Sequence, residues 1–481
     1  MSEQLSNIEL DAQSRNRIIS EMDKNFFVEA GAGSGKTTML VNRMVAMVEA
    51  GIDINKICAI TFTKAAAGEF YARFQRLLIE RSNPDIQWKD HGFAGQLPEP
   101  TEESRARCLN ALQNIDLCFM GTIDSFCYMI LSEHPSEAKI PSDSMIIEED
   151  ELKAFYHQIY IRISEGDYGK ELQDLSKVFR SLNNLGEHDV FQTAFPFLME
   201  NRNATVHFQE IRTADVDALF EEDRNKLLAA LRTVMDHPEL AAAGTKESVK
   251  AWEDLADAYR AVSRTWSTNY ASVMNNIKKV KHLRLKEDAL DQYGVSLGEI
   301  FVKTGKRKVW LACEEWISEL LEQMQSLQYG VSMTFMNACV PLIEEELKKK
   351  GYLSFFDDLL YLRDMLKKDA EEGGSLIRYI YDRHSYFLID EFQDTDPLQA
   401  QIFFYLSSEN PDPVWYECKP KPGSLFIVGD PKQSIYRFKG ADVASFLNVR
   451  SLMEKTGGAV LKLCCNFRSR TRCWNTLIAC L

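Results

Sequence analysis

The sequence lacks the features that would direct it out of the cell or into a membrane. Residues 1–5 hold no basic stretch followed by an apolar core, and no apolar run is long enough to span a bilayer. The eleven cysteines are scattered, only Cys464 and Cys465 are adjacent, and no C-x-x-C pair occurs. Neither a zinc site nor a disulfide framework is indicated, and we expect a soluble, cytoplasmic protein with reduced thiols and no membrane partner.

The sequence also lacks an excess of positive charge. Its 56 Lys and Arg residues stand against 71 Asp and Glu residues, for a net charge of −15. This balance argues against a protein that simply coats nucleic acid, although a local basic groove is compatible with it, because nearby charges set the local field. The 481 residues, 45% of them hydrophobic, suffice for two or three globular domains.

The most informative feature present is a glycine-rich tract at residues 26–38. An apolar, strand-like run enters this tract, and an amphipathic segment from Met39 to Ala50 follows it. This context is typical of a P-loop, in which backbone N–H groups and a helix N-terminus hold phosphates. The alternative is a glycine-rich turn between a strand and a helix. The residues predicted to bind the nucleotide here are Ala30, Gly31, Ala32, Gly33, Ser34, Gly35, Lys36, Thr37 and Thr38.

Two residues of this tract carry specific expectations. Lys36 is expected to reach the β- and γ-phosphates, and the Thr37 hydroxyl is expected to bind Mg²⁺. Ala30 stands where the strict pattern has glycine. The tract therefore predicts that the chain binds a nucleoside triphosphate.

Apolar periodicity divides the chain into parts. Short strand-like runs alternate with helical patterns in residues 1–141 and again in residues 371–457, which predicts an α/β fold with a parallel sheet. Residues 142–370 have an almost wholly helical pattern, including a predicted helix over residues 309–327. We therefore expect one α/β core interrupted by a large all-helical insertion, with a polar surface loop at residues 83–103.

Two acids follow the apolar run that ends at Ile389. In open α/β sheets, ligands bind at the carboxyl ends of strands. Asp390 is expected to hold Mg²⁺ there, and Glu391 to orient or deprotonate the attacking water. Taken alone, the pair is equally typical of a solvated strand end; together with the P-loop it favours catalysis.

A third segment, residues 427–442, begins as a strand and continues as a basic and aromatic loop. Gln433 is expected to sense the γ-phosphate, while Tyr436 and Phe438 are spaced to stack on bases. The alternative is that these rings anchor the loop in the core. Two basic clusters, residues 277–286 and 303–308, either contact DNA phosphates or form solvated helix faces.

Taken in order, these motifs resemble those of superfamily 1 DNA helicases of the UvrD/Rep type, and the AddA/RecB branch of helicase–nucleases fits best. The similarity extends from Leu5 to Ser469. Family motifs are further resembled by residues 8–13, the glutamine motif; by 60–69 and 121–126, which contact DNA in the family; by 354–359, before the acidic motif; and by 466–469, which open a second core.

The resemblance implies roles that spacing alone does not identify. Gln13 would read the adenine of ATP, and Arg468 would act as an arginine finger. Asp124 departs from the His common in the family, and since an acid cannot donate to a phosphate, the role of this position stays open. DNA contacts are implied for Thr61, Phe62, Thr63 and Thr122.

The resemblance also implies a domain plan and an activity. Residues 1–141 and 371–457 would form a RecA-like ATPase core, and residues 458–481 the start of a truncated second RecA-like core. We expect an ATP- and Mg²⁺-dependent DNA helicase that moves 3′ to 5′ in recombinational repair, with a helicase–nuclease partner subunit. Because the second core is only begun, the isolated chain is expected not to unwind DNA. The alternative is a nucleotide-gated DNA-binding module without unwinding activity.

Overall fold

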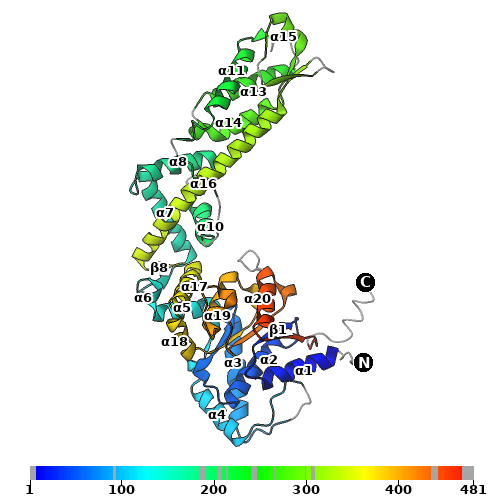
Figure 1. Cartoon of the computed structure of the whole chain (residues 1–481), viewed down its shortest axis with the longest axis vertical. Helices are drawn as coiled ribbons and strands as arrows, with labels where there is room; N and C mark the ends of the chain where they lie inside the picture. The colour runs from blue at the N-terminus through cyan, green and yellow to red at the C-terminus, as the bar shows by residue number, and fades with distance from the viewer. Residues whose placement is uncertain are drawn as a thin grey trace. The chain divides into compact units, whose positions relative to one another are not determined.

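The computed structural model describes residues 7–89, 94–183, 190–202, 208–212, 215–239, 246–264, 266–297, 300–304, 309–434 and 443–467. The chain forms two compact units (Figure 1). The core unit comprises residues 1–144 and 355–481, and the insertion unit comprises residues 145–354.

A six-stranded sheet forms the centre of the core unit. Its strand order is β11-β1-β10-β9-β2-β3, and every neighbouring pair is parallel. The predicted α/β fold with a parallel sheet is confirmed. Strands β2 and β10 are buried along their whole length, which explains their uninterrupted apolar sequences. The strands are β1 (Phe26–Ala30), β2 (Ile57–Thr61), β3 (Phe119–Thr122), β9 (Tyr386–Ile389), β10 (Leu425–Gly429) and β11 (Ala459–Leu463).

Helices pack on both faces of this sheet. One hydrophobic cluster joins the strands to α2 and α3, through residues such as Leu40 and Phe74. Elsewhere, Phe27 of β1 meets Phe446 of α20 edge-on, with ring centroids 4.9 Å apart. The helices of the core unit are α1 (Asn7–Ser20), α2 (Lys36–Glu49), α3 (Lys64–Ser82), α4 (Glu102–Gln113), α5 (Ile123–Glu133), α6 (Pro135–Ala138), α17 (Phe355–Glu371), α18 (Ser375–Arg383), α19 (Pro397–Ser407) and α20 (Val443–Lys455).

Two expected boundaries differ from the structure. Strand β11 pairs with β1 over five residues, from Phe26 opposite Ala459 to Ala30 opposite Leu463. The run after residue 458 is therefore the sixth strand of the first sheet and does not start a second one. Helix α17 belongs to the core unit, so the insertion ends at residue 354 and not at residue 370. Helical periodicity alone could not distinguish a helix of the insertion from one that packs on the core.

The insertion unit is mainly helical but contains a small sheet. Strands β5 (Arg284–Lys286), β7 (Val309–Ala312) and β6 (Phe301–Thr304) pair antiparallel in that order. The predicted helix over residues 309–327 is wrong at its start, because Val309 and Trp310 favour a strand. Its helices are α7 (Glu149–Glu165), α8 (Lys170–Asn183), α10 (Phe195–Glu200), α11 (Glu221–Met235), α13 (Lys246–Val262), α14 (Trp266–Val280), α15 (Glu287–Tyr293) and α16 (Glu314–Lys350), and strands β4 (Met145–Ile146) and β8 (Tyr352–Leu353) pair at its base.

Candidate nucleotide and nucleic-acid site

The glycine-rich loop forms a tight turn between β1 and α2. Gly33 and Gly35 have φ angles of 77° and 82°, a conformation that residues with a Cβ rarely adopt. Ser34 donates from its backbone N–H and its hydroxyl to the Gly31 carbonyl, at 3.2 and 2.7 Å. The first amides of α2 have no acceptor within the helix, and this turn leaves them at the edge of a cavity, as a phosphate site requires.

This cavity, of about 470 Å³, brings together residues that are far apart in the sequence. Lys36 donates from Nζ to Glu391 Oε2 at 2.8 Å. The Lys36 side chain is 10% exposed and that of Glu391 34%. The cavity is lined by Ala32, Gly33, Gly35, Lys36, Thr37, Thr38, Arg73, Glu391, Gln433 and Phe467. Arg73 was not identified from the sequence.

Asp390 lies beneath this cavity, at the carboxyl end of β9. It is 5% exposed, and its Oδ1 accepts from the Glu391 backbone N–H at 2.9 Å. Burial raises the pKa of Asp390 to about 6; the nearby Glu391 adds to the increase and Lys36 opposes it. A buried carboxylate of this kind is stabilised by a bound cation.

The residues present fit a Mg²⁺ ion of the kind that P-loop proteins use. Among the described residues, no group of three or more His, Cys, Asp or Glu side chains is arranged to hold a metal. Mg²⁺ at such sites needs no cage of that kind, because one or two protein oxygens, the phosphates and water complete its shell. Thr37 and Asp390 are the residues that would hold it.

Glu391 has a strained backbone and a buried neighbour. Its φ is 53°, an unusual value for a residue with a Cβ. Its Oε2 accepts from Nε2 of Gln393 at 2.7 Å, and the backbone N–H of Asp430 donates to Oε1 of Gln393 at 2.9 Å. Sequence reasoning missed Gln393 and Asp430, because these bonds join two strand ends that are distant in the chain.

Helix α1 and the segment after β11 complete the loop's surroundings. Arg15 pairs with Asp11 at 2.6 Å and donates to the Ser34 carbonyl at 2.8 Å. The backbone N–H of Phe467 donates to the Gly33 carbonyl at 2.8 Å, and the Arg15 guanidinium lies 5.0 Å from the centre of its ring. Gln13, which the resemblance assigns to adenine, is exposed on α1 and does not line the cavity.

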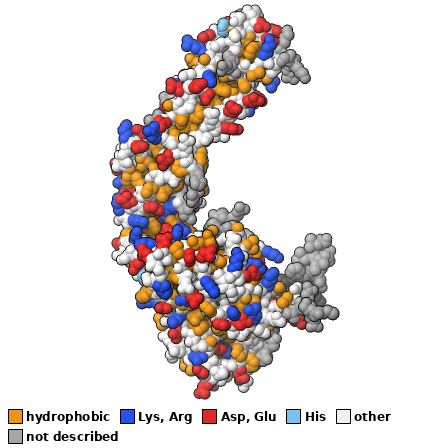
Figure 2. Space-filling model, in the orientation of Figure 1, with side chains coloured by type: hydrophobic (Ala, Val, Ile, Leu, Met, Phe, Trp, Pro, Cys, Tyr) orange, Lys and Arg blue, Asp and Glu red, His pale blue; other side chains and the backbone are white. Residues whose placement is uncertain are grey.

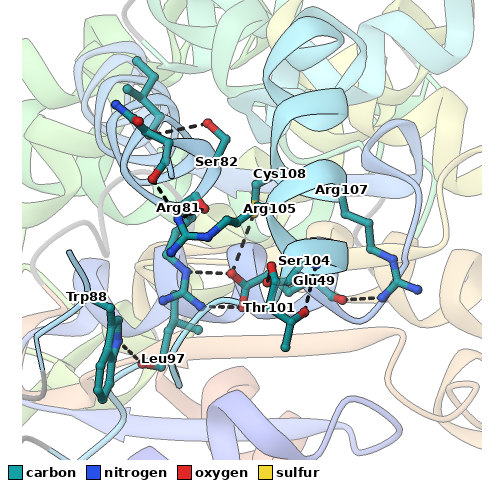
Figure 3. Close-up of polar contacts among 12 residues, drawn as sticks. Glu49, Arg81, Ser82, Trp88, Leu97, Thr101, Ser104, Arg105, Arg107 and Cys108 are labelled. Atoms are coloured by element: carbon teal, nitrogen blue, oxygen red, sulfur yellow. Dashed lines mark hydrogen bonds and ion pairs between the residues drawn. The ribbon is translucent and has the colours of Figure 1, made fainter. Parts of the chain in front are cut away.

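A second cavity, of about 550 Å³, adjoins the first at Gly35, Thr38 and Phe467. The segment expected as a surface loop at residues 83–103 forms one of its walls. Figure 3 shows how this wall is held: Trp88 donates from Nε1 to the Leu97 carbonyl at 3.2 Å, and Arg81 pairs with Glu49 at 2.6 Å. The lining includes Arg15, Met39, Asn42, Leu77, Ile86, Trp88, Leu97 and Pro100.

The residues expected to contact DNA lie at the ends of two neighbouring strands. Thr61 of β2 is paired with Thr122 of β3. Thr61 is fully buried, whereas Thr63 is exposed and caps α3, and Thr122 caps α5. Phe62, between them, is half-buried. Tyr436, Phe438 and Arg468 lie outside the described residues.

Basic side chains do not gather into one broad surface. On the face drawn in Figure 2, Lys and Arg side chains are interspersed with Asp and Glu side chains. In the cluster at residues 277–286, Lys279 pairs with Asp254 at 3.4 Å, while Arg284 and Lys286 are exposed on β5. In the cluster at residues 303–308, Lys303 pairs with Glu287, and residues 305–308 lie outside the described part of the chain.

A glycine-rich loop, a helix N-terminus and a pair of strand-end carboxylates at one sheet edge define a P-loop nucleoside triphosphate-binding core. Residues 10–454 match the model of the UvrD/Rep helicase N-terminal domain, and the chain belongs to this family of ATP-dependent DNA helicases. The family predicted from the motifs is confirmed.

Curated relatives include three proteins named as the AddA-type subunit of an ATP-dependent helicase/nuclease. The one from Pediococcus pentosaceus is 24% identical, covering 95% of this chain and 37% of the relative. Those from Ligilactobacillus salivarius and Listeria monocytogenes are 26% and 25% identical, covering 90% and 94% of this chain and 35% and 38% of the relatives. The predicted relation to helicase–nucleases of the AddA type is thereby confirmed, and the chain spans little more than a third of the length of these relatives. No helix of the described residues is long and apolar enough to cross a membrane.

Proposed function

We propose that this chain binds ATP and Mg²⁺ and couples ATP hydrolysis to movement on single-stranded DNA. The observation that carries the proposal is the direct contact of Lys36 with Glu391, at 2.8 Å, at the mouth of the glycine-rich loop. A P-loop lysine and a strand-end glutamate are the groups that hydrolysis of a terminal phosphate needs side by side.

In this proposal, binding and chemistry use the two groups in turn. Lys36 exchanges the carboxylate of Glu391 for the β- and γ-phosphates, which frees one oxygen of Glu391 to orient the attacking water. A Mg²⁺ ion bound by Thr37 and Asp390 supplies neutralisation of phosphate charge. Gln433, which lines the same cavity, faces the terminal phosphate.

The neighbouring cavity would take the base and ribose. Its apolar wall and the ring of Phe467 offer stacking surface, and Arg15 lies against that ring. Gln13 would have to turn inward from its exposed position to read the adenine edge. Arg73, which lines the phosphate cavity, adds a positive charge for the phosphates.

For nucleic acid, we propose that the exposed strand-end residues Thr63 and Thr122 contact the DNA backbone, with the ring of Phe62 beside a base. Tyr436 and Phe438 would add further rings, and Arg468 would complete the ATP site. Movement from 3′ to 5′, a role in recombinational repair inside the cell and a partner nuclease subunit follow from the resemblance and from the printed names of the relatives.

The test is ATP hydrolysis by the chain with and without single-stranded DNA, beside the Lys36→Ala variant. We expect turnover that depends on Mg²⁺ and falls by about 10³-fold or more in the variant, because the charge that meets the phosphates is gone. Nucleotide-dependent DNA binding without hydrolysis would instead support a nucleotide-gated binding module. Unchanged ATP affinity in Lys36→Ala would contradict the assignment of the loop.

A further inference from the structure

A buried glutamine joins the two acidic turns at this edge of the sheet. Gln393 is 2% exposed and lies in the short 3₁₀ turn Phe392–Asp394 after β9. Its amide nitrogen Nε2 donates to Glu391 Oε2 at 2.7 Å. Its amide oxygen Oε1 accepts from the backbone N–H of Asp430 at 2.9 Å. One side chain therefore ties the end of β9 to the end of β10.

The connection continues to the residue that faces the terminal phosphate. Gln433 donates from Nε2 to Asp430 Oδ2 at 2.7 Å. The other carboxylate oxygen of Asp430 accepts from the backbone N–H of Lys432 at 3.1 Å, which fixes the turn. Three hydrogen bonds thus form an unbroken path from Gln433 through Asp430 and Gln393 to Glu391.

The end of β10 is shaped to admit this glutamine. A Cβ atom at Gly429 would lie 2.9 Å from Oε1 of Gln393 and 3.2 Å from its backbone nitrogen. It would also lie 2.8 Å from the ring of Phe446. Only glycine lets β10 pass this close to the glutamine, so the strand and the side chain are fitted to each other.

The path needs an amide at this position. A glutamine donates and accepts at the same time, whereas Glu offers only acceptors when ionised and Met offers neither strong donor nor strong acceptor. Lys36 also donates to Oε2 of Glu391, at 2.8 Å. When Lys36 turns to the phosphates, Gln393 is left to hold this oxygen.

We propose that Gln393 is a positioning residue: it holds Glu391 in place for the attacking water and couples it, through Asp430, to the contact of Gln433 with the terminal phosphate. This inference rests on the proposed ATPase function. Gln393 does not line the phosphate cavity, so its effect is on turnover and not on binding of ATP.

The first experiment compares Gln393→Met with Gln399→Met in the full chain. Gln399 is a matched control, since it is 7% exposed and its side chain accepts from the Asp396 backbone N–H at 3.1 Å, in the cap of α19. We expect Gln393→Met to lower kcat about 10- to 100-fold, as loss of a supporting hydrogen bond does at other sites, with the Kd for ATP unchanged. Gln399→Met should lower Tm and leave kcat unchanged.

A double-mutant cycle separates positioning from general damage. If Gln393 acts through Glu391, Gln393→Met should cause no further loss of kcat in the Glu391→Gln background. Additive losses in this cycle would overturn the proposal. So would a fall in kcat that comes with weaker ATP binding and with a loss of Tm larger than that of Gln399→Met.

Hydrogen exchange tests the path without nucleotide. The Asp430 amide should be protected in the unsubstituted protein and in Gln393→Glu, which keeps an acceptor oxygen, and should exchange faster in Gln393→Met. Equal protection in all three would overturn the path. If the unsubstituted chain does not hydrolyse ATP, the proposed function fails and this inference with it; hydrolysis that Gln393→Met leaves intact overturns the inference alone.

Discussion

Two groups of acids lie near the carboxyl edge of the same sheet, and their surroundings are opposite. At the end of β9, Glu391 is paired with Lys36 at 2.8 Å, and this lysine also lowers the cost of ionising Asp390. Near the start of α17, Asp358 is fully buried, and its Oδ2 has no hydrogen-bond partner among the described residues.

The second group has only acids acting strongly on one another. Burial raises the pKa of Asp358 well above its usual value, and Asp124, Asp357 and Asp396 add to the increase. Only the Leu359 backbone N–H, which donates to Oδ1 at 2.7 Å, favours the charged form. The comparison teaches that acids at one sheet edge differ by their neighbours: a cation prepares the first group for ligand exchange, and its absence from the strongest influences on Asp358 favours a neutral carboxyl.

The largest expected effect is on turnover by the first group. Glu391→Gln keeps the shape of the side chain and removes its basic oxygen, so kcat should fall by about 10²–10⁴-fold while Mg·ATP still binds. Steady-state hydrolysis and nucleotide binding, measured on the same preparation, check this. Parental turnover in the variant would assign the catalytic role to another group and erase the contrast.

Asp390→Asn should separate stability from function. Because the folded-state pKa is about 6 and the ordinary value is 3.8, the nucleotide-free protein should lose stability as pH rises between these values, and the full loss should be present above about 6. The variant should therefore be more stable at pH 7, by up to about 3 kcal/mol. Its stabilisation by Mg²⁺ with nucleotide should be lost.

Chemical denaturation at pH 4 and pH 7 tests this prediction. The gain from Asp390→Asn should be present at pH 7 and nearly absent at pH 4, where the native carboxyl is already protonated. A variant that is less stable than the parent at pH 7 would show that Asp390 is stabilised as an anion by its surroundings.

A smaller effect is expected from giving the second group a positive neighbour. Asp124→His, which installs the residue common in the family, should stabilise the protein by about 1 kcal/mol when the His is protonated, since it replaces a repulsive charge near Asp358 by an attractive one. Thermal unfolding near pH 6 checks this, with Asp124→Asn as a control that removes only the repulsion. A lower Tm in both variants would show that Asp124 stabilises the fold through other contacts.

The smallest expected effect is on the stability of the first group. Lys36→Met removes the ion pair with Glu391, whose side chain is partly exposed, so unfolding in the absence of nucleotide should change by no more than about 1 kcal/mol. Denaturant titration of the nucleotide-free protein measures this. A much larger loss would mean that the pair supports the fold, and the contrast between the two groups would then concern structure as well as ligand exchange.

The sequence was sufficient where a function is written in consecutive residues. The loop at residues 30–38 and the acids after Ile389 lie at strand ends because parallel strands place their carboxyl ends at one edge. Arg15, Gln393 and Asp430 could not be recognised, because their partners depend on which strands are neighbours, and β10 lies between β1 and β9.

Other features depended on tertiary contacts that a local pattern does not contain. Strand β11 has the same apolar pattern whether it opens a new sheet or joins an existing one, and pairing with β1 decides. Trp88 lies in a stretch rich in proline and glycine, which predicts a surface loop, yet its bond to the Leu97 carbonyl folds the stretch into a cavity wall. The helical pattern through Val309 was likewise overridden by strand pairing with β5 and β6.

The way the chain leaves β11 makes the phosphate loop a mechanical anchor. The side chain of Asn466 donates to the Ala32 carbonyl at 3.0 Å, and the next residue, Phe467, donates from its backbone to Gly33. Asp11 accepts from the backbone amides of Cys464 and Cys465, at 2.7 and 3.1 Å. Any tension on the chain beyond Phe467 is therefore applied first to the loop that grips the nucleotide, so pulling there and gripping ATP oppose or assist each other directly.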